Sequence, residues 1–330
     1  MNQHDNLLHI IAQAVEQASL SNQARTVLLR NLDHLKNTQL NLLITGATGA
    51  GKSSTINALF DMSMAKVGTG CDPQTSVISN YTLNNMVLWD SPGLGDGIKQ
   101  DRQHASAIKH KLQETNLAGD LVIDLVLVII DGSTRDLGTA TKLINDVVIP
   151  NLGQHPEQRL LVAINQADVA LKGPHAWDHQ HNRPTPQAER FLDEKVSSVQ
   201  ARIKEATGVN IAPIYYVAGY TDGQEKQRPY NLSKLLFLIV EHLPKNKRVI
   251  LADRTLSTEK THWCDDDKHI DYNNKTRESF WEAIVDSTTK GADIGEEVGM
   301  LFGTAGEKVG RFVGGMVGAL SGGLKYLFGF

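Results

Sequence analysis

The stretch that decides the fold of this chain spans eight residues and reads Gly46-Ala47-Thr48-Gly49-Ala50-Gly51-Lys52-Ser53. It fits the pattern G-x-x-x-x-G-K-[ST], in which glycines let the backbone wrap with its N–H groups directed at phosphate oxygens. An apolar run over 40–45 precedes it and indicates a buried strand, and a helix-compatible run over 53–60 follows it. This order of strand, glycine loop and helix predicts a phosphate-binding loop at a helix N-terminus.

The chemistry of phosphate binding predicts a role for each of the two polar residues that end the motif. Lys52 is expected to reach the β- and γ-phosphates, and Ser53 to give its hydroxyl to Mg²⁺. Ser54 follows in the first turn of the predicted helix. The residues predicted to contact the phosphates are Gly46, Ala47, Thr48, Gly49, Ala50, Gly51, Lys52, Ser53 and Ser54.

A second motif follows the predicted strand over 86–90, where Asp90-Ser91-Pro92-Gly93 fits D-x-x-G. A carboxylate at this strand end can hold a Mg²⁺-bound water, and the Gly93 N–H can bond the γ-phosphate and so sense its presence. Between the two motifs, 61–76 is rich in Gly, Thr, Asp and Pro and is expected to be a mobile loop. Thr75 is expected to contact Mg²⁺ and the γ-phosphate, with Thr69 as the competing choice.

A third motif indicates the base. The predicted strand over 159–164 ends in Asn165-Gln166-Ala167-Asp168. An Asp that accepts from both guanine donors, N1–H and N2–H₂, cannot do so with adenine, so Asp168 favours guanine. Asn165 is expected to bond the N7/O6 side of the base and to brace the phosphate loop. After the predicted strand over 211–217, the pair Val217-Ala218 would bring the Ala218 N–H to the guanine O6.

Composition bounds the class of protein. The chain has 330 residues, of which 41% are hydrophobic, enough for one α/β domain with additional segments. With 33 basic and 37 acidic residues the net charge is −4, so specific DNA binding is not expected. Cys71 and Cys264 are too few for a disulfide framework, and the first residues lack the pattern of a signal peptide. A cytoplasmic location is therefore expected.

The remaining periodicities outline the domains. Apolar residues at helical spacing predict two amphipathic helices within 1–38, which would either pack on the sheet or bind a partner. The core is expected over 39–244, with further strands at 77–83 and 121–131, helices at 136–148 and 232–243, and a solvated Pro- and His-rich loop at 171–186. The last part, 245–330, is expected to be a linker followed by a helical tail.

Glycine recurs at nearly every fourth position through 291–330. Such a stripe of small residues lets two helices approach closely. Two interpretations stay open: a helical hairpin folded on the core, or a tail that associates with a membrane surface or with a second copy of the chain. The run is marginal for a membrane span, because about 20 strongly apolar residues are needed.

From Leu40 to Leu243 the chain resembles the Era-like group of translation-factor-related GTPases, most closely small bacterial GTPases of prophage-like regions with a 50S-ribosome-binding-GTPase-like domain. The wording of residues 46–60 is also similar to immunity-related GTPases and septins. The resemblance implies a three-layer α/β, Ras-like P-loop domain with a six-stranded, mostly parallel sheet. It also implies GTP or GDP and Mg²⁺ as cofactors, with Ser53, Thr75 and Asp90 at the metal, Lys52, Thr75 and Gly93 in catalysis, and Asn165, Gln166, Asp168, Val217 and Ala218 at the base.

Three positions depart from the related patterns. Leu94 stands where Ras-type enzymes place a water-orienting Gln, so hydrolysis needs another positioning group. Gln166 replaces the Lys of N-K-x-D, and Gly49 replaces the Asn of potassium-stimulated relatives. Arg102 and Arg135 are the candidates for an arginine finger by sequence proximity alone.

Three functions are weighed. The leading one is a slow GTPase that acts as a nucleotide-dependent switch. Its effector would be the ribosome, a membrane or a second copy of the chain. If the effector is a membrane, the chain would lie peripherally on its inner face. The alternative is a membrane-remodelling or pore-like protein whose tail is gated by GTP. The weakest is an ATPase.

Overall fold

The fold is described from a computed structural model. The described residues are 7–62, 66–68, 78–95, 97–135, 137–173, 176–222, 225–253 and 255–290. The predictions made for Thr69, Thr75 and the tail over 291–330 lie outside these residues.

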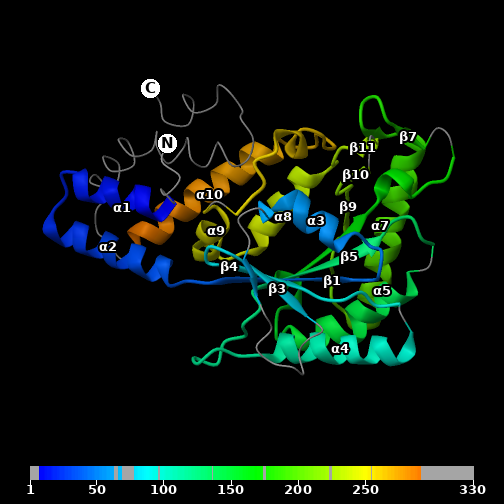
Figure 1. The fold of residues 1–330 in the computed structure, drawn as a ribbon, viewed down its shortest axis with the longest axis horizontal. Helices are drawn as coiled ribbons and strands as arrows, with labels where there is room; N and C mark the ends of the chain where they lie inside the picture. Colours follow the sequence, from blue (N-terminus) through cyan, green and yellow to red (C-terminus); the bar gives the residue numbers. More distant parts are fainter. Residues whose placement is uncertain are drawn as a thin grey trace.

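A seven-stranded sheet forms the centre of the molecule, in the order β2-β3-β4-β1-β5-β6-β9 (Figure 1). Its strands are β1 (Leu40–Gly46), β2 (Lys66–Gly68), β3 (Ser79–Leu83), β4 (Met86–Asp90), β5 (Leu125–Asp131), β6 (Leu160–Asn165) and β9 (Ile214–Tyr215). Neighbours from β4 to β9 are parallel, whereas β2 and β3 are antiparallel to their neighbours. All six predicted strands are present in the order of a Ras-like core, and β2 joins the edge within the stretch expected to be a loop.

Strands β1, β5 and β6 are almost wholly buried, as central parallel strands covered on both faces must be. Their side chains alternate between two apolar clusters: Leu42 and Ile44 of β1 belong to one, and Leu43 belongs to the other. Strands β3, β5 and β9 are shorter than the stretches predicted for them. Strand β5 begins four residues later than expected, because Val122 donates its N–H to Glu114 O outside the sheet.

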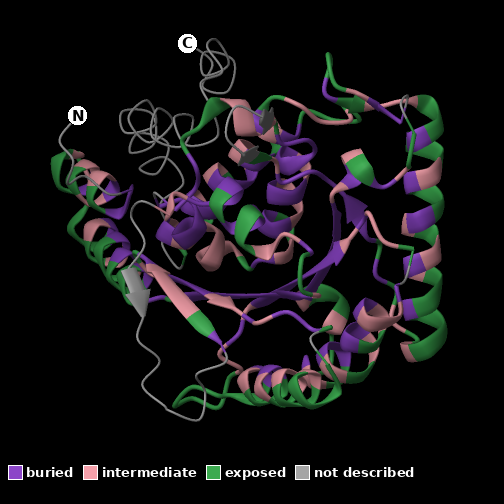
Figure 2. Cartoon of the chain, turned by 45° about the vertical axis from the view of Figure 1, so that its right-hand side comes forward, coloured by how far each residue is buried: buried purple, intermediate pink, exposed green. Residues whose placement is uncertain are grey.

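Helices cover both faces (Figures 1 and 2). One face packs α3 (Lys52–Leu59) and α8 (Leu232–His242), and the other packs α4 (Ile98–Gln113), α5 (Gly138–Lys142) and α7 (Pro186–Thr207). The helix predicted over 136–148 is α5 followed by a π-helical turn, Leu143–Val148. Helices α4 and α7 lie in stretches for which no element was predicted.

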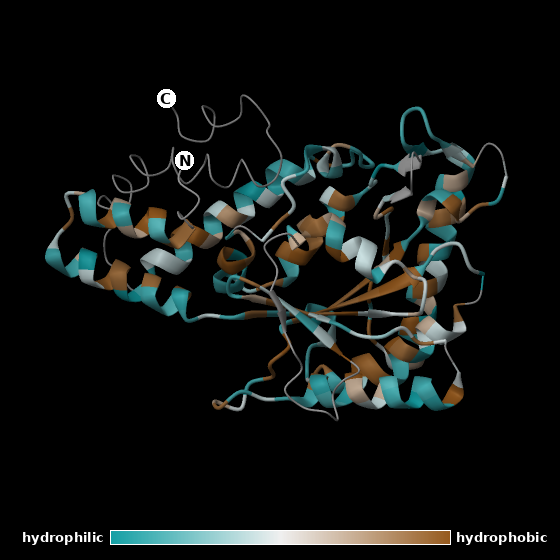
Figure 3. Cartoon of the chain, viewed as in Figure 1, coloured by the Kyte–Doolittle hydropathy of each residue, from teal (hydrophilic) through white to brown (hydrophobic). Residues whose placement is uncertain are grey.

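A second group of helices extends the α3/α8 side: α1 (Leu7–Gln17), α2 (Asn22–Lys36), α9 (Lys245–Leu251) and α10 (Tyr272–Thr289), here called the helical layer. The two predicted N-terminal helices are present as α1 and α2. They join the opposite end of the chain, since Asn31 Nδ2 of α2 donates to Thr288 O of α10 at 2.8 Å. Figure 3 shows apolar residues on the inner sides of these helices.

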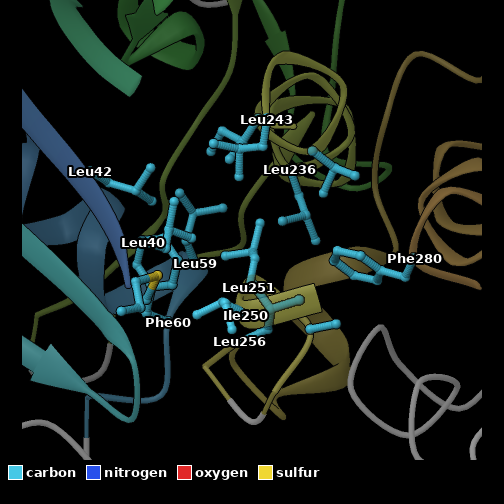
Figure 4. Close-up of a cluster of buried hydrophobic side chains, with 14 of the residues drawn as sticks. Leu40, Leu42, Leu59, Phe60, Leu236, Leu243, Ile250, Leu251, Leu256 and Phe280 are labelled. Atoms are coloured by element: carbon cyan, nitrogen blue, oxygen red, sulfur yellow. The ribbon is translucent and has the colours of Figure 1, made fainter. Parts of the chain in front are cut away.

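The polar stretch around 258–275, within the last part of the chain, was expected to be a linker or a mobile segment, but the chain between α9 and α10 is packed on the core. Leu256 and Trp263 are 1% and 2% exposed, and Phe280 of α10 is fully buried. Figure 4 shows Leu256 and Phe280 in one cluster with Leu59 of α3 and Leu236 of α8. The polar composition of the segment predicted a linker because it does not reveal that a few large apolar side chains, buried in the core, hold the segment in place.

Within the part of the chain described above, no helix combines the length and the apolar character needed to cross a bilayer.

Candidate nucleotide-binding site

The phosphate loop joins β1 to α3 through positions that only glycine can occupy. A Cβ on Gly46 would lie 2.1 Å from Ile129 O, and one on Gly51 would lie 2.2 Å from Asn165 Nδ2. Gly49 and Gly51 have φ of +80° and +85°, in the left-handed region that side chains disfavour. The loop therefore wraps as its motif predicts, and α3 begins at Lys52.

Lys52 bends back over this loop. Its Nζ donates to Ala47 O at 3.1 Å and lies 3.4 Å from Gly46 O. Thr48, Gly49, Ser53 and Ser54 are exposed around it. An ammonium group and exposed backbone thus meet at the N-terminus of α3, where an anion is favoured.

Asp90 ends β4 beside the loop, in register with Ile44 of β1. Its Oδ1 is buried and has no hydrogen-bond partner among the described residues. Burial raises the pKa of this carboxyl, and the charge of Lys52 opposes the rise. A buried carboxylate oxygen of Asp90, without a partner in the described part of the chain, and the exposed hydroxyl-bearing residue Ser53 supply the oxygen donors that Mg²⁺ prefers.

The chain after Asp90 runs along the phosphate loop. Thr48 N–H donates to Leu94 O at 2.9 Å, and Leu94 N–H donates to Gly46 O at 3.3 Å. Gly93 lies so close that an added Cβ would be 2.4 Å from Thr48 N. The structure therefore brings Gly93 to the loop as predicted, but the backbone pairing through Leu94 was not foreseen, because no side-chain motif signals it.

Asn165 connects the loop to the base side. It is 3% exposed, its Nδ2 donates to Ala50 O at 3.0 Å, and its Oδ1 accepts from Ala218 N–H at 2.9 Å. The predicted brace to the loop is present. The Ala218 N–H, which was expected to approach guanine O6, is instead donated to Asn165, because the buried amide oxygen needs a partner.

Gln166 stands in place of the Lys of N-K-x-D, a replacement expected to weaken guanine binding because it removes a long stem and a charge over the base plane. The structure shows a contact to the phosphate loop that was not predicted. The Gln166 backbone is left-handed, with φ of 60°, and its Nε2 donates to Gly49 O at 2.7 Å. The amide thus reaches across the site and braces the loop a second time. Neighbouring Val217 is buried and pairs its backbone with Tyr230.

Asp168 lies in a short 3-10 turn, Ala167–Val169, and is half-buried. Burial raises the pKa of its carboxyl, while backbone N–H groups and the charge of His179 oppose the rise. His179 belongs to the turn between the short strands β7 (Trp177–Asp178) and β8 (Arg183–Pro184). The insertion expected to be a solvated loop therefore lies near Asp168, the residue predicted to bind the base, a proximity that the sequence spacing does not reveal.

A buried pair of hydroxyl groups connects α3 to the chain after β9, next to the candidate site. Thr55 Oγ1 of α3 lies 2.6 Å from Tyr216 OH, directly after β9. Burial raises the pKa of Tyr216, so this hydroxyl stays neutral. The pair links the helix that follows the phosphate loop to the strand that leads to Ala218.

The arginine-finger candidates Arg102 and Arg135 are both exposed.

Comparison with known proteins agrees with this arrangement. Residues 41–166 match the family model described as 50S ribosome-binding GTPase. The protein YfjP of Escherichia coli K12 is 28% identical over 147 residues, which cover 43% of this chain and 47% of that protein. The mouse mitochondrial 5-taurinomethyluridine-[tRNA] synthase subunit GTPB3 is 26% identical over 146 residues, covering 42% and 28%. The chain thus spans about half or less of the length of these curated relatives.

Among solved structures, the chain is similar to Toc33 from Arabidopsis thaliana in complex with Mg²⁺ and GMPPNP. The identity is 17% and the TM-score 0.37, with coverage of 66% of this chain and 85% of that one. It is also similar to a probable GTP-binding protein engB, at 18% identity and a TM-score of 0.35, with coverage of 61% and 97%. By the family match and the loop geometry together, residues 41–166 lie in a P-loop GTPase domain.

Proposed function

We propose that the chain binds GTP and hydrolyses it to GDP and phosphate, and that it acts as a nucleotide-dependent switch. One observation carries the proposal: Asn165 joins Ala50 of the phosphate loop to Ala218 of the predicted base side through two hydrogen bonds of 3.0 and 2.9 Å. The phosphate and base subsites are thereby held at one edge of the sheet, where open α/β sheets bind their ligands.

Each subsite supplies one part of the chemistry. Lys52 and the loop N–H groups stabilise negative charge on the β- and γ-phosphates, and Asp168 selects guanine by accepting from N1–H and N2–H₂. Ser53 and Asp90 would hold Mg²⁺, with Thr75 as the proposed third group. When bound, Mg²⁺ neutralises charge on the phosphate oxygens. Loss of the γ-phosphate would release the chain near Gly93, which is how a switch reports hydrolysis.

The test uses nucleotide turnover by the purified full chain. GTP turnover is expected to need Lys52 and Mg²⁺, so Lys52→Ala and EDTA should abolish it, and ATP should not be used. An Asp168→Asn variant should lose GTP and accept XTP, since its amide can donate to the xanthine C2 carbonyl. Equal use of GTP and ATP by the unaltered chain would favour the ATPase alternative and would refute guanine selection by Asp168.

The finer family assignment, to Era-like GTPases of the prophage type, and the effector belong to the same proposal. The family description names 50S ribosome binding, which makes the large ribosomal subunit the first partner to test. The chain is expected to cosediment with 50S subunits when a non-hydrolysable GTP analogue is bound. Cosedimentation should be weaker with GDP. Cosedimentation that is absent with both nucleotides would remove the ribosome as effector.

The tail over 291–330 is proposed to associate with a membrane surface or with a second copy of the chain. Flotation with liposomes, compared between the full chain and a variant ending at residue 290, tests the first. Sedimentation equilibrium of the same pair tests the second. The pore-like alternative function would require tail-dependent flotation.

A further inference from the structure

The residue after Gly93 cannot orient the water that attacks the γ-phosphate. Leu94 is apolar and 8% exposed. Its backbone is also committed, because its N–H donates to Gly46 O and its carbonyl accepts from Thr48 N–H. The polar group that hydrolysis needs at this place must come from another element.

Helix α4 brings such a group to Gly93. His104, which is half-buried, has its Nδ1 2.9 Å from Gly93 O. A carbonyl oxygen only accepts, so Nδ1 must carry the hydrogen of this bond. In the neutral ring, Nε2 then holds the lone pair and is an acceptor. The contact therefore selects the tautomer that can accept a hydrogen bond from water.

The start of α4 is held so that His104 stays near this backbone. Gly95 N–H donates to Asp101 Oδ1 at 2.8 Å, and Asp101 N–H donates to Gly97 O at 2.8 Å. One turn beyond His104, Ile108 is fully buried in the apolar cluster that also contains Leu43 of β1. The helix is thus anchored on both sides of the histidine, and a fixed side chain orients a reactant at a smaller entropic cost.

We infer that His104 replaces the missing polar side chain after Gly93, and that its Nε2 orients the attacking water. The inference rests on the proposed GTPase function. The water oxygen forms the new bond to the γ-phosphorus, and the bond from that phosphorus to the β–γ bridging oxygen breaks, so GDP leaves with the electron pair. One water proton stays on the released phosphate, and the other passes to solvent by way of Nε2.

Three substitutions separate this role from a merely structural one. His104→Ala removes both ring nitrogens. His104→Asn keeps an N–H near the position of Nδ1 but has nothing at Nε2, whereas His104→Gln extends an amide toward the Nε2 position. The control is His110→Ala, an exposed histidine on the same helix.

Single-turnover GTP hydrolysis with excess protein is the measurement, together with the affinity for a non-hydrolysable analogue. We expect His104→Ala and His104→Asn to lower the rate about tenfold or more. Analogue affinity should stay within about twofold, a split that indicates loss of transition-state stabilisation. His104→Gln should retain more activity than His104→Asn, and His110→Ala should match the unaltered chain.

Two results would overturn the inference while leaving the GTPase function intact. One is a His104→Asn rate equal to that of the unaltered chain, which would mean that the ring only holds the Gly93 carbonyl. The other is a parallel loss of analogue affinity in all three variants, which would mean a structural role. If the unaltered chain shows no turnover that depends on Lys52, the proposed function itself falls, and the role of His104 falls with it.

Discussion

The nucleotide edge of the sheet and the helical layer are held together by different kinds of contact. At the nucleotide edge, single polar side chains bridge separate loops, as Asn165 and Gln166 do to the phosphate loop. In the helical layer, buried apolar residues such as Leu28 of α2 and Phe280 of α10 do this work. Damage to the layer should therefore reduce stability, whereas damage at the edge should reduce ligand affinity.

The 255–262 segment joins the two regions. Ser257 N–H donates to Leu59 O, Asp61 N–H donates to Thr255 O, and His262 Nδ1 lies 2.9 Å from Ala58 O. The end of α3, which begins at the phosphate loop, is thus bonded to the chain that leads into α10. The two regions differ in the proportion of polar and apolar contacts and are not separate units, because they share a cluster of buried side chains (Figure 4).

The largest expected effect is in the helical layer. Leu28→Ala should lower the free energy of unfolding by about 2–5 kcal/mol, because the leucine is fully buried. Leu29→Ala is the matched control, since its leucine is 36% exposed, and should cost about 1 kcal/mol or less. Urea unfolding measures both. Equal costs would show that α2 is not held by its buried face.

The next effect is at the nucleotide edge. Asn165→Ala should weaken GDP binding about tenfold or more, because it leaves Ala50 O and Ala218 N–H without their partner at a cost of about 1–3 kcal/mol. Titration with a fluorescent GDP analogue measures the change, with the exposed Asn210→Ala as control. An affinity equal to that of the control variant would remove Asn165 as the connection between the subsites.

A smaller effect is expected at Gln166, whose bond to Gly49 is exposed to solvent. Gln166→Ala should weaken GDP binding by about threefold to tenfold, in line with one hydrogen bond of about 0.5–1.5 kcal/mol. Gln166→Lys should restore the affinity, because an ammonium group can donate to the same carbonyl. The same titration decides, and a Lys variant as weak as the Ala variant would contradict the bracing role.

The smallest effect concerns pH. Burial raises the pKa of Asp90 in the folded chain. The folded state therefore binds a proton that the unfolded state releases, so this group lowers stability above its folded pKa and the loss is recovered as the pH falls through that value. Ligand-free Asp90→Asn should have a higher Tm than the unaltered chain at pH 7.5, with a difference that shrinks toward pH 4.

The sign of this last difference should invert when Mg²⁺ and GDP are present, because the variant lacks the carboxylate proposed to serve the metal. Thermal unfolding in EDTA and in Mg²⁺ with GDP tests this. A Tm of Asp90→Asn below that of the unaltered chain in EDTA at pH 7.5 would show that Asp90 is not a buried charge kept for a ligand.

Much of the site was predictable because its motifs are local. Residues 46–51 form a loop whose glycines lie where φ is positive or where a Cβ has no room, and Asp90 and Asn165 end strands that were predicted from apolar runs. Other features were not predictable. Helices α4 and α7 carry many polar residues and were not predicted, although the buried positions of α7 recur at helical spacing, and the linker character expected for 258–275 ignored the burial of Trp263.

By itself, the sequence determined the phosphate loop and the order of the main strands along the chain, and it supports the proposed preference for guanine, because each depends on residues adjacent in the chain. Only the tertiary structure decided that Leu94 pairs with the loop, that His104 reaches Gly93, and that α2 meets α10. The physical reason is distance along the chain. A backbone hydrogen bond or a burial event between remote segments leaves no pattern in either segment, so it becomes visible only when the sheet brings the two together.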